Sequence, residues 1–184
     1  KFLVAIPDFQ PNGVSRQLAQ SVTDGLRARL AGRFTLVSRE DIKAVLEEHA
    51  IQQVLTAEAV EMGKILGATK MIFGNVTRVE QSEAFGVSLR MVDVEQGKVD
   101  LAESVDIVPR EQLETALDYL AIIIKEQIPI TGAIVQVITD STVELNLGYE
   151  SGVEAGKRFE IIQETKNGKI QAGMIEITKV GSVS

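Results

Sequence analysis

Residues 35–79, TLVSREDIKAVLEEHAIQQVLTAEAVEMGKILGATKMIFGNVTRV, contain the clearest structural signals in this chain. Ser38 and Asp41 stand at capping-box spacing, in which a hydroxyl accepts a hydrogen bond from a helix N–H and an acid three residues later reaches back. Thr56 is a candidate N-cap for a second helix, and Gly67 stands where a left-handed residue would end that helix. The stretch therefore predicts a strand, two capped helices and a second strand, without a catalytic group.

The residues before this stretch begin an alternation of strands and helices. Residues 2–6 form an apolar run closed by Pro7, which is typical of a central strand buried on both faces. A helix with one apolar stripe follows, and Gly32 is expected to end it. The residues of that stripe are Val14, Leu18, Val22, Leu26 and Leu30. Residues 34–37 form the strand that leads into the capped helices.

A meander of three strands and a long helix follow the stretch. The strands are predicted over residues 71–80, 84–94 and 98–107. In the second strand apolar residues alternate with Gly86, Ser88 and Arg90, which indicates one buried and one wet face. The third strand is expected to place four apolar side chains on a common face: Val99, Leu101, Val105 and Ile107.

Pro109 opens the predicted helix, which spans residues 110–128 and whose apolar stripe should lie flat on the sheet. Pro129 ends it, and the composition changes there. We therefore predict an α+β domain over residues 1–128, built as an α/β-like mixed sheet with helices packed on it. Residues 129–184 are predicted to form a second, separate domain.

The second domain is predicted to be a small all-β, barrel-like unit. Its candidate strands are residues 133–139, 142–147, 158–164 and 169–179. Asn167-Gly168 predicts a hairpin turn, and Val153 is expected to fill a glycine-rich corner at residues 148–157. About 55 residues form a marginal core, so we expect this domain either to dock on the first or to continue beyond Ser184.

Composition restricts the possible functions. The chain has no cysteine, which excludes disulfides and thiol chemistry, and its net charge of -7 disfavours a nucleic-acid partner. Arg27, Arg29 and Arg33 form a dense basic cluster, which we interpret as a solvated helix end. No apolar run approaches the ~20 residues of a membrane-spanning helix. Because the chain does not begin with Met, we expect a processed or trimmed piece of a longer protein.

Candidate acid–base residues lack partners. Asp8 ends the first predicted strand, where acids in α/β folds meet ligands, but no base or nucleophile accompanies it. His49 is the one histidine in the sequence and stands at the end of an apolar stripe, as a packed or capping residue does. We therefore predict that the protein is not an enzyme and has no catalytic residues.

Metal and cofactor sites are also not predicted. Asp93, Glu95 and Asp100 flank a hairpin and could loosely collect Ca²⁺, but they lack the spacing of a calcium loop. The segment 152–157 superficially resembles a phosphate loop, yet it has three residues between its glycines and Arg158 after its lysine. We expect neither a bound metal nor a cofactor.

The first predicted domain resembles a family of bacterial envelope proteins. The runs LVSREDIKAVLEEH, KILGATKMIFGNVTRVE and VSLRMVDVEQGKV resemble the curli production assembly/transport component (CsgG) family and the amino-terminal domain of TolB-type proteins. The matching elements are Arg39-Glu40, Leu46-Glu47-Glu48, Leu66-Gly67-Ala68, Gly74-Asn75-Val76, Val92-Asp93 and Gly97. Residues 143–159 resemble the carboxy-terminal domain of flagellar assembly protein T.

These resemblances imply a non-enzymatic accessory protein of a bacterial cell-envelope assembly that acts by protein–protein contact. They imply a periplasmic location, a lipid-bearing cysteine upstream of Lys1 that anchors the protein to the outer membrane, and a homo-oligomer or ring. They also imply a role in secretion, a flagellar ring or cell-wall synthesis. Since only Gln81-Ser82-Glu83 joins the first two meander strands, there is no room for the inserted hairpins of the curli pore. The alternative prediction is a small-molecule or ion-binding sensor that uses the corner at residues 148–157.

Overall fold

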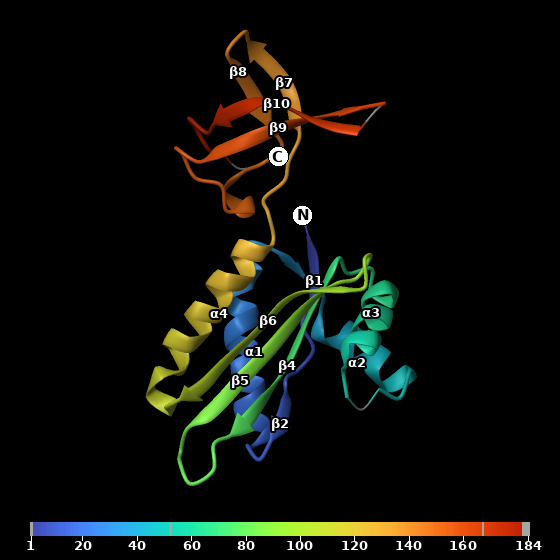
Figure 1. Cartoon of the computed structure of the whole chain (residues 1–184), viewed down its shortest axis with the longest axis vertical. Coiled ribbons are helices and arrows are strands. Elements are labelled where there is room, and N and C mark those ends of the chain that lie inside the picture. Colours follow the sequence, from blue (N-terminus) through green and yellow to red (C-terminus); the bar gives the residue numbers. More distant parts are fainter. Residues whose placement is uncertain (1, 52, 167, 182–184) are drawn as a thin grey trace. The chain divides into compact units, whose positions relative to one another are not determined.

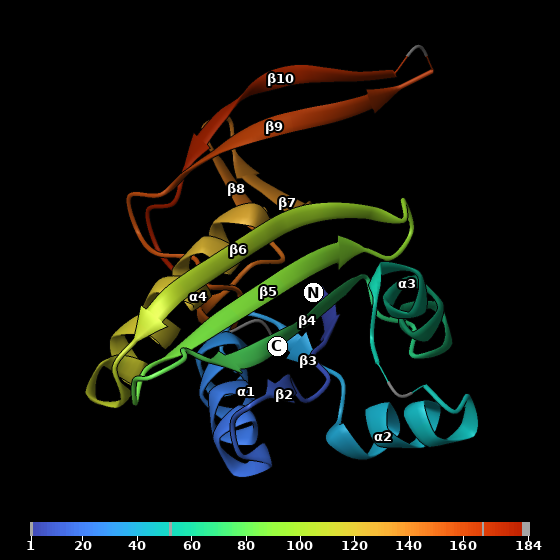
Figure 2. The same ribbon diagram turned by 60° about the horizontal axis from the view of Figure 1, so that its bottom comes forward.

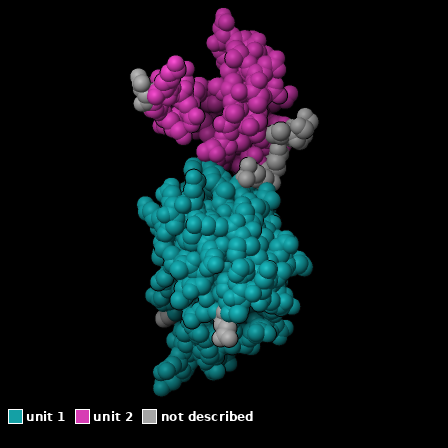
Figure 3. Space-filling view, turned by 90° about the vertical axis from the view of Figure 1, so that its right-hand side faces the viewer, with its two compact units in different colours: residues 1–129 teal, residues 130–184 magenta. Residues whose placement is uncertain are grey.

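The computed structural model describes residues 2–51, 53–166 and 168–181, and it leaves the side chains of Ile107 and Glu150 undescribed. The chain divides into two compact units, Lys1–Pro129 and Ile130–Ser184 (Figure 3). The first combines a mixed sheet with helices, and the second contains strands joined by turns (Figure 1). The predicted α+β class is therefore confirmed.

The described strands of unit 1 form a six-stranded mixed sheet with the order β3-β1-β4-β5-β6, in which β2 pairs with β4. β1 is parallel to β3 and β4, and β2 is parallel to β4, whereas β4, β5 and β6 form an antiparallel meander. β1 lies between β3 and β4, as predicted for a central strand. The strands are β1 (Leu3–Ala5), β2 (Gln10–Asn12), β3 (Thr35–Leu36), β4 (Lys70–Arg78), β5 (Phe85–Asp93) and β6 (Lys98–Val108).

The described helices of unit 1 cover the sheet unequally (Figure 2). They are α1 (Arg16–Ala31), α2 (Arg39–Glu48), α3 (Thr56–Ile65) and α4 (Leu113–Gln127), the last preceded by the 3-10 turn η1 (Arg110–Gln112). Helices α1 and α4 pack on one face, which we call the covered face. Its core joins the predicted stripes of both helices to strand residues, including Leu26, Leu120, Ile124, Ile72 and Leu89.

The other face, which we call the open face, is covered by α2 and α3 only at one end. There the helices pack on Ala5, Met71, Phe73, Val92 and Val94. Farther along the same sheet, the side chains of Arg90, Ala102 and Ser104 are exposed. The open face therefore combines a small apolar core with an accessible polar surface.

The starts of α2 and α3 follow the predicted signals with two differences. Ser38 caps α2, and its Oγ accepts from the Asp41 N–H at 3.1 Å, but the Asp41 carboxylate accepts from the Ser38 hydroxyl at 2.7 Å. Leu55, not Thr56, is the N-cap residue of α3, and it makes no side-chain cap. The helix consequently begins one residue earlier than an N-cap at Thr56 would require.

Both helices end in the same Schellman arrangement. After α3, Gly67 has a φ of +65°, and the Ala68 N–H donates to the Gly63 carbonyl at 2.8 Å. After α2, Ala50 takes the equivalent place with a φ of +51°, and the Ile51 N–H donates to the Leu46 carbonyl at 3.0 Å. The sequence pattern predicts Gly67 but not Ala50, because alanine is not a left-handed cap residue in the usual pattern.

The predicted alternation holds in β5 and fails near the ends of β6. Val87, Leu89 and Met91 are buried, whereas Arg90 is exposed. In β6, Val99 is 37% exposed and Val108 is buried, because register shifts interrupt the β5–β6 pairing near both ends. Val99 pairs with Val92 and Leu101 with Met91 across a register shift, so the prediction that Val99 shares a face with Leu101 and Val105 is wrong. The Ile107 side chain lies outside the described residues.

Unit 2 is all-β, as predicted, but its described strands form two two-stranded antiparallel sheets and not a closed barrel. Its elements are β7 (Ile134–Thr139), β8 (Thr142–Leu145), η2 (Tyr149–Ser151), β9 (Arg158–Thr165) and β10 (Gly168–Glu176). Val153 is buried, as expected, whereas every residue of β7 is exposed. Gly168 begins β10 with a φ of +122°, and Asn167 lies outside the described residues. A two-stranded sheet by itself cannot bury both of its faces, because no other element packs on each side.

Candidate functional site on the open face of the sheet

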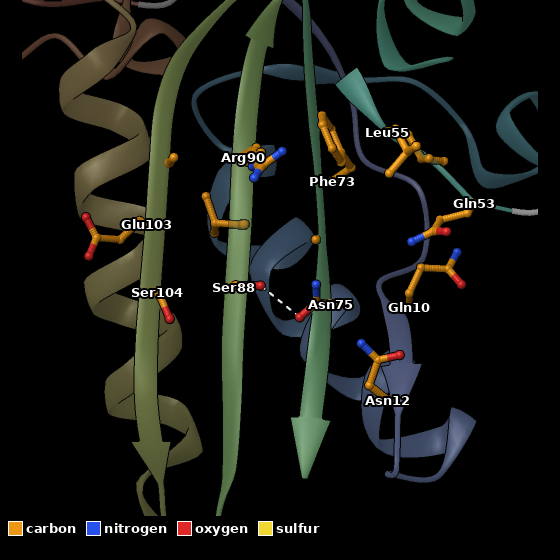
Figure 4. Close-up of a pocket in the computed structure, with 14 residues that line it drawn as sticks. Gln10, Asn12, Gln53, Leu55, Phe73, Asn75, Ser88, Arg90, Glu103 and Ser104 are labelled. Carbon is orange, nitrogen blue, oxygen red and sulfur yellow. Dashed lines mark hydrogen bonds between the residues drawn. The ribbon is translucent and has the colours of Figure 1, made fainter. Parts of the chain in front are cut away.

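The open face contains a groove of about 760 Å³ (Figure 4). Strands β2, β4, β5 and β6 form its floor, and residues 53–55, immediately before α3, form one end. Its residues are Gln10, Asn12, Gln53, Val54, Leu55, Phe73, Gly74, Asn75, Ser88, Leu89, Arg90, Ala102, Glu103 and Ser104. This volume is in the range of protein sites that bind small ligands or segments of a partner.

Strand register places four small polar residues in one row across the groove. Gln10 is the partner of Asn75, Asn75 of Ser88, and Ser88 of Ser104. Because directly paired residues share one side of a sheet, the row runs across β2, β4, β5 and β6. Its short amide and hydroxyl side chains leave the floor accessible.

The hydrogen bonds of Asn75 determine which of its atoms a ligand would meet. The Asn75 Oδ1 accepts from the Ser88 hydroxyl at 2.8 Å and from the Thr77 hydroxyl at 3.2 Å. Figure 4 shows the first of these bonds and the Asn75 nitrogen pointing away from it. With its acceptor oxygen already occupied by two donors, Asn75 presents its two N–H groups as donors.

Arg90 supplies the positive charge of the groove. It stands in the neighbouring row, between Phe73 of β4 and Ala102 of β6. Its side chain is exposed, and no residue in the described part of the chain makes an ion pair or hydrogen bond with its guanidinium. Glu103 lines the groove but points away from Arg90 (Figure 4). Among the described residues, therefore, the five N–H donors of Arg90 have no acceptor and no acid neutralises its charge.

An apolar contact point lies at the helix end of the groove. Leu55 is 51% exposed, while the neighbouring Val54 and Phe73 are buried. Figure 4 shows Phe73 between Leu55 and Arg90. One surface thus offers an apolar side chain, a cation and amide donors.

The arginine cluster of α1 joins that helix to the rest of unit 1 and is not a solvated helix end. Arg27 donates to the carbonyls of Ile6 and Val37, at 3.0 Å and 2.8 Å. Arg33 donates to the carbonyls of Lys125 and Ile128, at 2.8 Å and 2.7 Å, and so holds the end of α4. The sequence-based interpretation is wrong because these partners are remote in sequence.

Arg29 has two carboxylate partners on α4. Its guanidinium donates to Asp118 and Glu114 at 2.6 Å each. The hydrogen bond to Glu114, and then that to Asp118, raises the pKa of Arg29 above its usual value. Arg29 and Arg33 therefore join α1 to α4, and Arg27 joins α1 to the residues that follow β1 and β3.

Asp8 forms an ion pair with an arginine at the start of α2. Its Oδ1 lies 2.9 Å from the Arg39 Nη2, and the Asp24 Oδ1 lies 2.6 Å from the same atom. The geometry is that of an ion pair and not of aligned hydrogen bonds. Arg39 belongs to the Arg-Glu pair that opens α2, so the predicted strand-end acid anchors this helix next to β1.

Asp93 and Asp100 bind a lysine at the place where the sequence suggests a loose calcium site. The Lys70 Nζ donates to the Asp93 Oδ2 at 2.7 Å and to the Asp100 Oδ2 at 2.5 Å. Burial, the largest influence, lowers the pKa of Lys70, but the hydrogen bonds to Asp100 and Asp93 outweigh it and the pKa is raised. The bond from Lys70, followed by that from the Gln96 N–H, lowers the pKa of Asp93. The Glu95 side chain is exposed, and only the backbone N–H of Glu95 acts on Asp93, as the smallest of the causes that lower its pKa.

The remaining candidates from the sequence are His49 and the corner at residues 148–157, and both make backbone hydrogen bonds within the fold. His49 is the C-cap residue of α2 and is exposed, and its backbone N–H bonds to the Val45 carbonyl. The corner at residues 148–157 contains η2, and the Gly156 N–H donates to the Ile177 carbonyl at 2.7 Å. Within the described residues, no group of three or more histidine, cysteine or acidic residues could hold a metal ion. The ligand-binding corner stays a prediction.

Sequence patterns do not reveal the groove. The alternation over Gly86, Ser88 and Arg90 indicates a wet face, but it does not identify which strands extend that face. Gln10 and Asn12 belong to a strand whose sequence is typical of a turn. Only the pairing of β2 with β4 brings these amides beside Asn75.

A protein-family match covers β2 and β4 of the groove floor and ends at the turn between β4 and β5. The model of the curli production assembly/transport component CsgG matches residues 6–84. The family resemblance inferred from sequence is therefore confirmed over these residues. No curated protein matches the chain. The resemblance of residues 143–159 to flagellar assembly protein T stays a prediction.

Solved structures resemble this chain in fold. Lipoprotein GNA1162 from Neisseria meningitidis is 12% identical with a TM-score of 0.51, over 70% of this chain and all of that one. The LpoB C-terminal domain from Escherichia coli is 13% identical with a TM-score of 0.48, over 59% of this chain and 83% of that one. TolB from Acinetobacter baumannii is 17% identical with a TM-score of 0.49, over 68% of this chain and 28% of its own length.

In the part of this chain that is described, no helix has both the length and the apolar character needed to cross a membrane.

Proposed function

We propose that this protein is a non-enzymatic accessory component of a bacterial cell-envelope assembly and that it acts through protein contacts on the open face of its sheet. The CsgG match over residues 6–84 is the observation that carries this proposal. The groove supports it, because its donors and its exposed Leu55 form a surface for contact. The Ser88 and Ser104 hydroxyls of the row donate to Asn75 and Asp106, and no histidine among the described residues lines the groove as the base that would activate them as nucleophiles.

The finer parts of the proposal concern location and assembly. We propose a periplasmic protein, held at the outer membrane by a lipid on an upstream cysteine, that serves secretion, a flagellar ring or cell-wall synthesis. The structural relative from Neisseria meningitidis is a lipoprotein, which supports the lipid anchor. A homo-oligomer or ring is also part of the proposal, and it rests on the resemblance to the CsgG family.

Site-specific photocrosslinking in the native host tests the proposed contact. A benzophenone amino acid is placed at Ser104 on the open face and, as the matched control, at the exposed Gln17 on α1. Crosslinked products are identified by mass spectrometry. We expect Ser104, and not Gln17, to crosslink to a protein of the cell envelope. Equal crosslinking at the two positions, or products confined to cytoplasmic proteins, would contradict the proposal.

Deletion and fractionation provide an independent test. We expect the protein to fractionate with the periplasm or the outer membrane, and its loss to impair envelope integrity, secretion or motility. A deletion strain in which all three are normal would argue strongly against an accessory role in an envelope assembly.

A further inference from the structure

We propose that the groove binds an extended acidic segment of a different protein, with a carboxylate on Arg90 and an apolar side chain on Leu55. This inference rests on the proposed function, because it gives the chemistry of a partner at the same surface. It goes further by specifying what the partner must present.

The positive charge of Arg90 indicates that the partner segment presents a carboxylate. Arg90 is exposed and has no ion pair in the described residues, unlike Arg27, Arg29 and Arg33, which donate to neighbouring elements. A guanidinium matches a carboxylate with two parallel hydrogen bonds, and such charge-assisted pairs are stronger than neutral ones. The unpaired cation of Arg90 therefore selects a ligand with one well-placed acid.

The neutral row supports the same conclusion. Ser88 stands two positions before Arg90 on β5, so both side chains are on one face, about 7 Å apart along the strand. The Asn75 N–H groups next to Ser88 face the groove as donors. A segment that enters here meets donors on Asn75 and Arg90, which suit the carboxylate and the backbone carbonyls of a peptide. It also meets acceptors on Ser88 and Ser104, whose hydroxyl protons are donated to Asn75 and Asp106 and which suit backbone N–H groups.

The shape of the groove favours an extended segment over an enclosed small molecule. Its floor includes Gly74, which has no side chain, and the short side chains of Ala102 and Ser104, so that a polypeptide backbone can approach the sheet closely. Leu55 and Arg90 are on opposite sides of Phe73 (Figure 4). Strands lie ~4.8 Å apart and extended chain advances ~3.3 Å per residue, so the apolar and acidic residues should be within about three positions.

The charge of the whole protein argues against a polyanion. The chain has a net charge of -7, which would repel nucleic acid or a densely charged glycan over most of the surface. A single acid beside an apolar residue avoids this repulsion. We assign this segment to a different protein, and a homo-oligomer of the chain would then use surfaces other than the groove.

A random peptide library displayed on phage provides the probe. It is selected against the full chain and counter-selected against Arg90→Glu. We expect enriched peptides to carry Asp or Glu within three positions of an apolar residue. Their binding should weaken at least tenfold in Arg90→Gln and several-fold in Leu55→Ser. Arg78→Gln, which removes the same charge from an exposed position on β4 outside the groove, should change binding less than twofold.

A double-mutant cycle makes the test specific. Replacing the peptide acid by its amide should cost about as much as Arg90→Gln, and the two changes together should cost little more than either alone. Failure to enrich any peptide, enrichment without acids, or equal binding to Arg90→Gln would overturn the inference. An Arg90-dependent dimer in light scattering would overturn the assignment to a different protein.

The two proposals fail in different ways. If Ser104 crosslinks to an envelope protein and Arg90→Gln does not weaken that contact, the proposed function stands and the acidic-segment inference fails. If peptides that depend on Arg90 are selected but the photocrosslinker at Ser104 attaches to no envelope protein, the acidic-segment inference stands and the envelope role fails.

Discussion

The two faces of one sheet differ in what their side chains do. On the covered face, Leu89 and Met91 of β5 meet α1 and α4 in a continuous apolar core. On the open face of the same strand, Ser88 and Arg90 remain accessible. Strand β5 therefore contributes one set of alternate residues to the covered core and leaves Ser88 and Arg90 of the other set accessible, so mutations can test the two faces separately.

The largest expected effect is on the covered face. Leu120 of α4 is fully buried there, and Leu120→Ala should lower the free energy of unfolding by about 3 kcal/mol through lost burial and a cavity. Ile122→Ala on the same helix is the control, because Ile122 is 54% exposed and should cost about 0.5 kcal/mol. Urea unfolding measures both. A similar loss for the two variants would contradict the assignment of α4's buried side.

A smaller loss of unfolding free energy is expected at the ion pairs of Lys70 with Asp93 and Asp100, which join β4, β5 and β6 and which we call the clamp. Lys70→Met leaves Asp93 and Asp100 without their shared cation, and it should cost about 2 kcal/mol, less than for a fully buried pair because the carboxylates are partly exposed. Lys43→Met is the control, since Lys43 forms an exposed helix pair with Glu47 and should cost below about 0.5 kcal/mol. Equal losses in urea unfolding would show that the clamp contributes no more than a surface pair.

The clamp also predicts a pH dependence. The folded-state pKa of Asp93 is lowered, so its stabilising contribution is present above the unfolded pKa of about 3.9 and is lost as the pH falls through the folded value. The pKa of Lys70 is raised, so its contribution is complete below about 10.4 and is lost as the pH rises through the folded value. Unfolding free energies from pH 2 to 7 should fall less steeply with acid in Lys70→Met than in the parent.

The helices on the open face allow a subtler test. Gly67→Ala should destabilise the protein by about 1 kcal/mol, because a left-handed backbone strains any residue with a Cβ. Ala50→Gly, at the equivalent end of α2, should be neutral or stabilising by a few tenths of a kcal/mol, since relief of strain is partly offset by glycine's chain entropy. Thermal unfolding of both variants measures the contrast, and a clear loss of stability in both would refute it.

The smallest effect on stability belongs to the accessible residues of the open face. Arg90→Gln and Ser104→Ala should each change the free energy of unfolding by less than about 0.5 kcal/mol, because both side chains are exposed. The prediction is checked in the same urea experiment as Leu120→Ala. A loss of several kcal/mol for Arg90→Gln would show that this residue supports the fold, and the separation of the two faces would then fail.

Local patterns are enough to predict most of unit 1. The Ser38 cap, the Gly67 stop and the apolar stripe that includes Leu26 depend on residues near one another in sequence. The predictions for Thr56 and Val99 fail because a helix begins one residue early and because the strand register shifts. In unit 2 the strands are predictable, but whether they close into a barrel depends on pairings that short apolar alternations do not specify.

The candidate site depends on long-range pairing. Arg29 and Asp118 are 89 positions apart, and Lys70 and Asp100 are 30 apart, so composition cannot show which charges neutralise one another. In sequence, Arg90 looks like any of these paired residues. It differs because no described acid approaches it in the folded chain.

The α+β class, the principal helix ends and the envelope-family resemblance follow from the sequence alone, because they depend on local hydrogen bonding and on periodic burial. Three features emerge only when the chain is folded. They are the arginines that join α1 to other parts of unit 1, the clamp of Lys70 on Asp93 and Asp100, and the row of Gln10, Asn75, Ser88 and Ser104. The physical reason is that a side chain's charge and hydrogen bonds acquire a function only from the partners that strand register and helix packing bring to it.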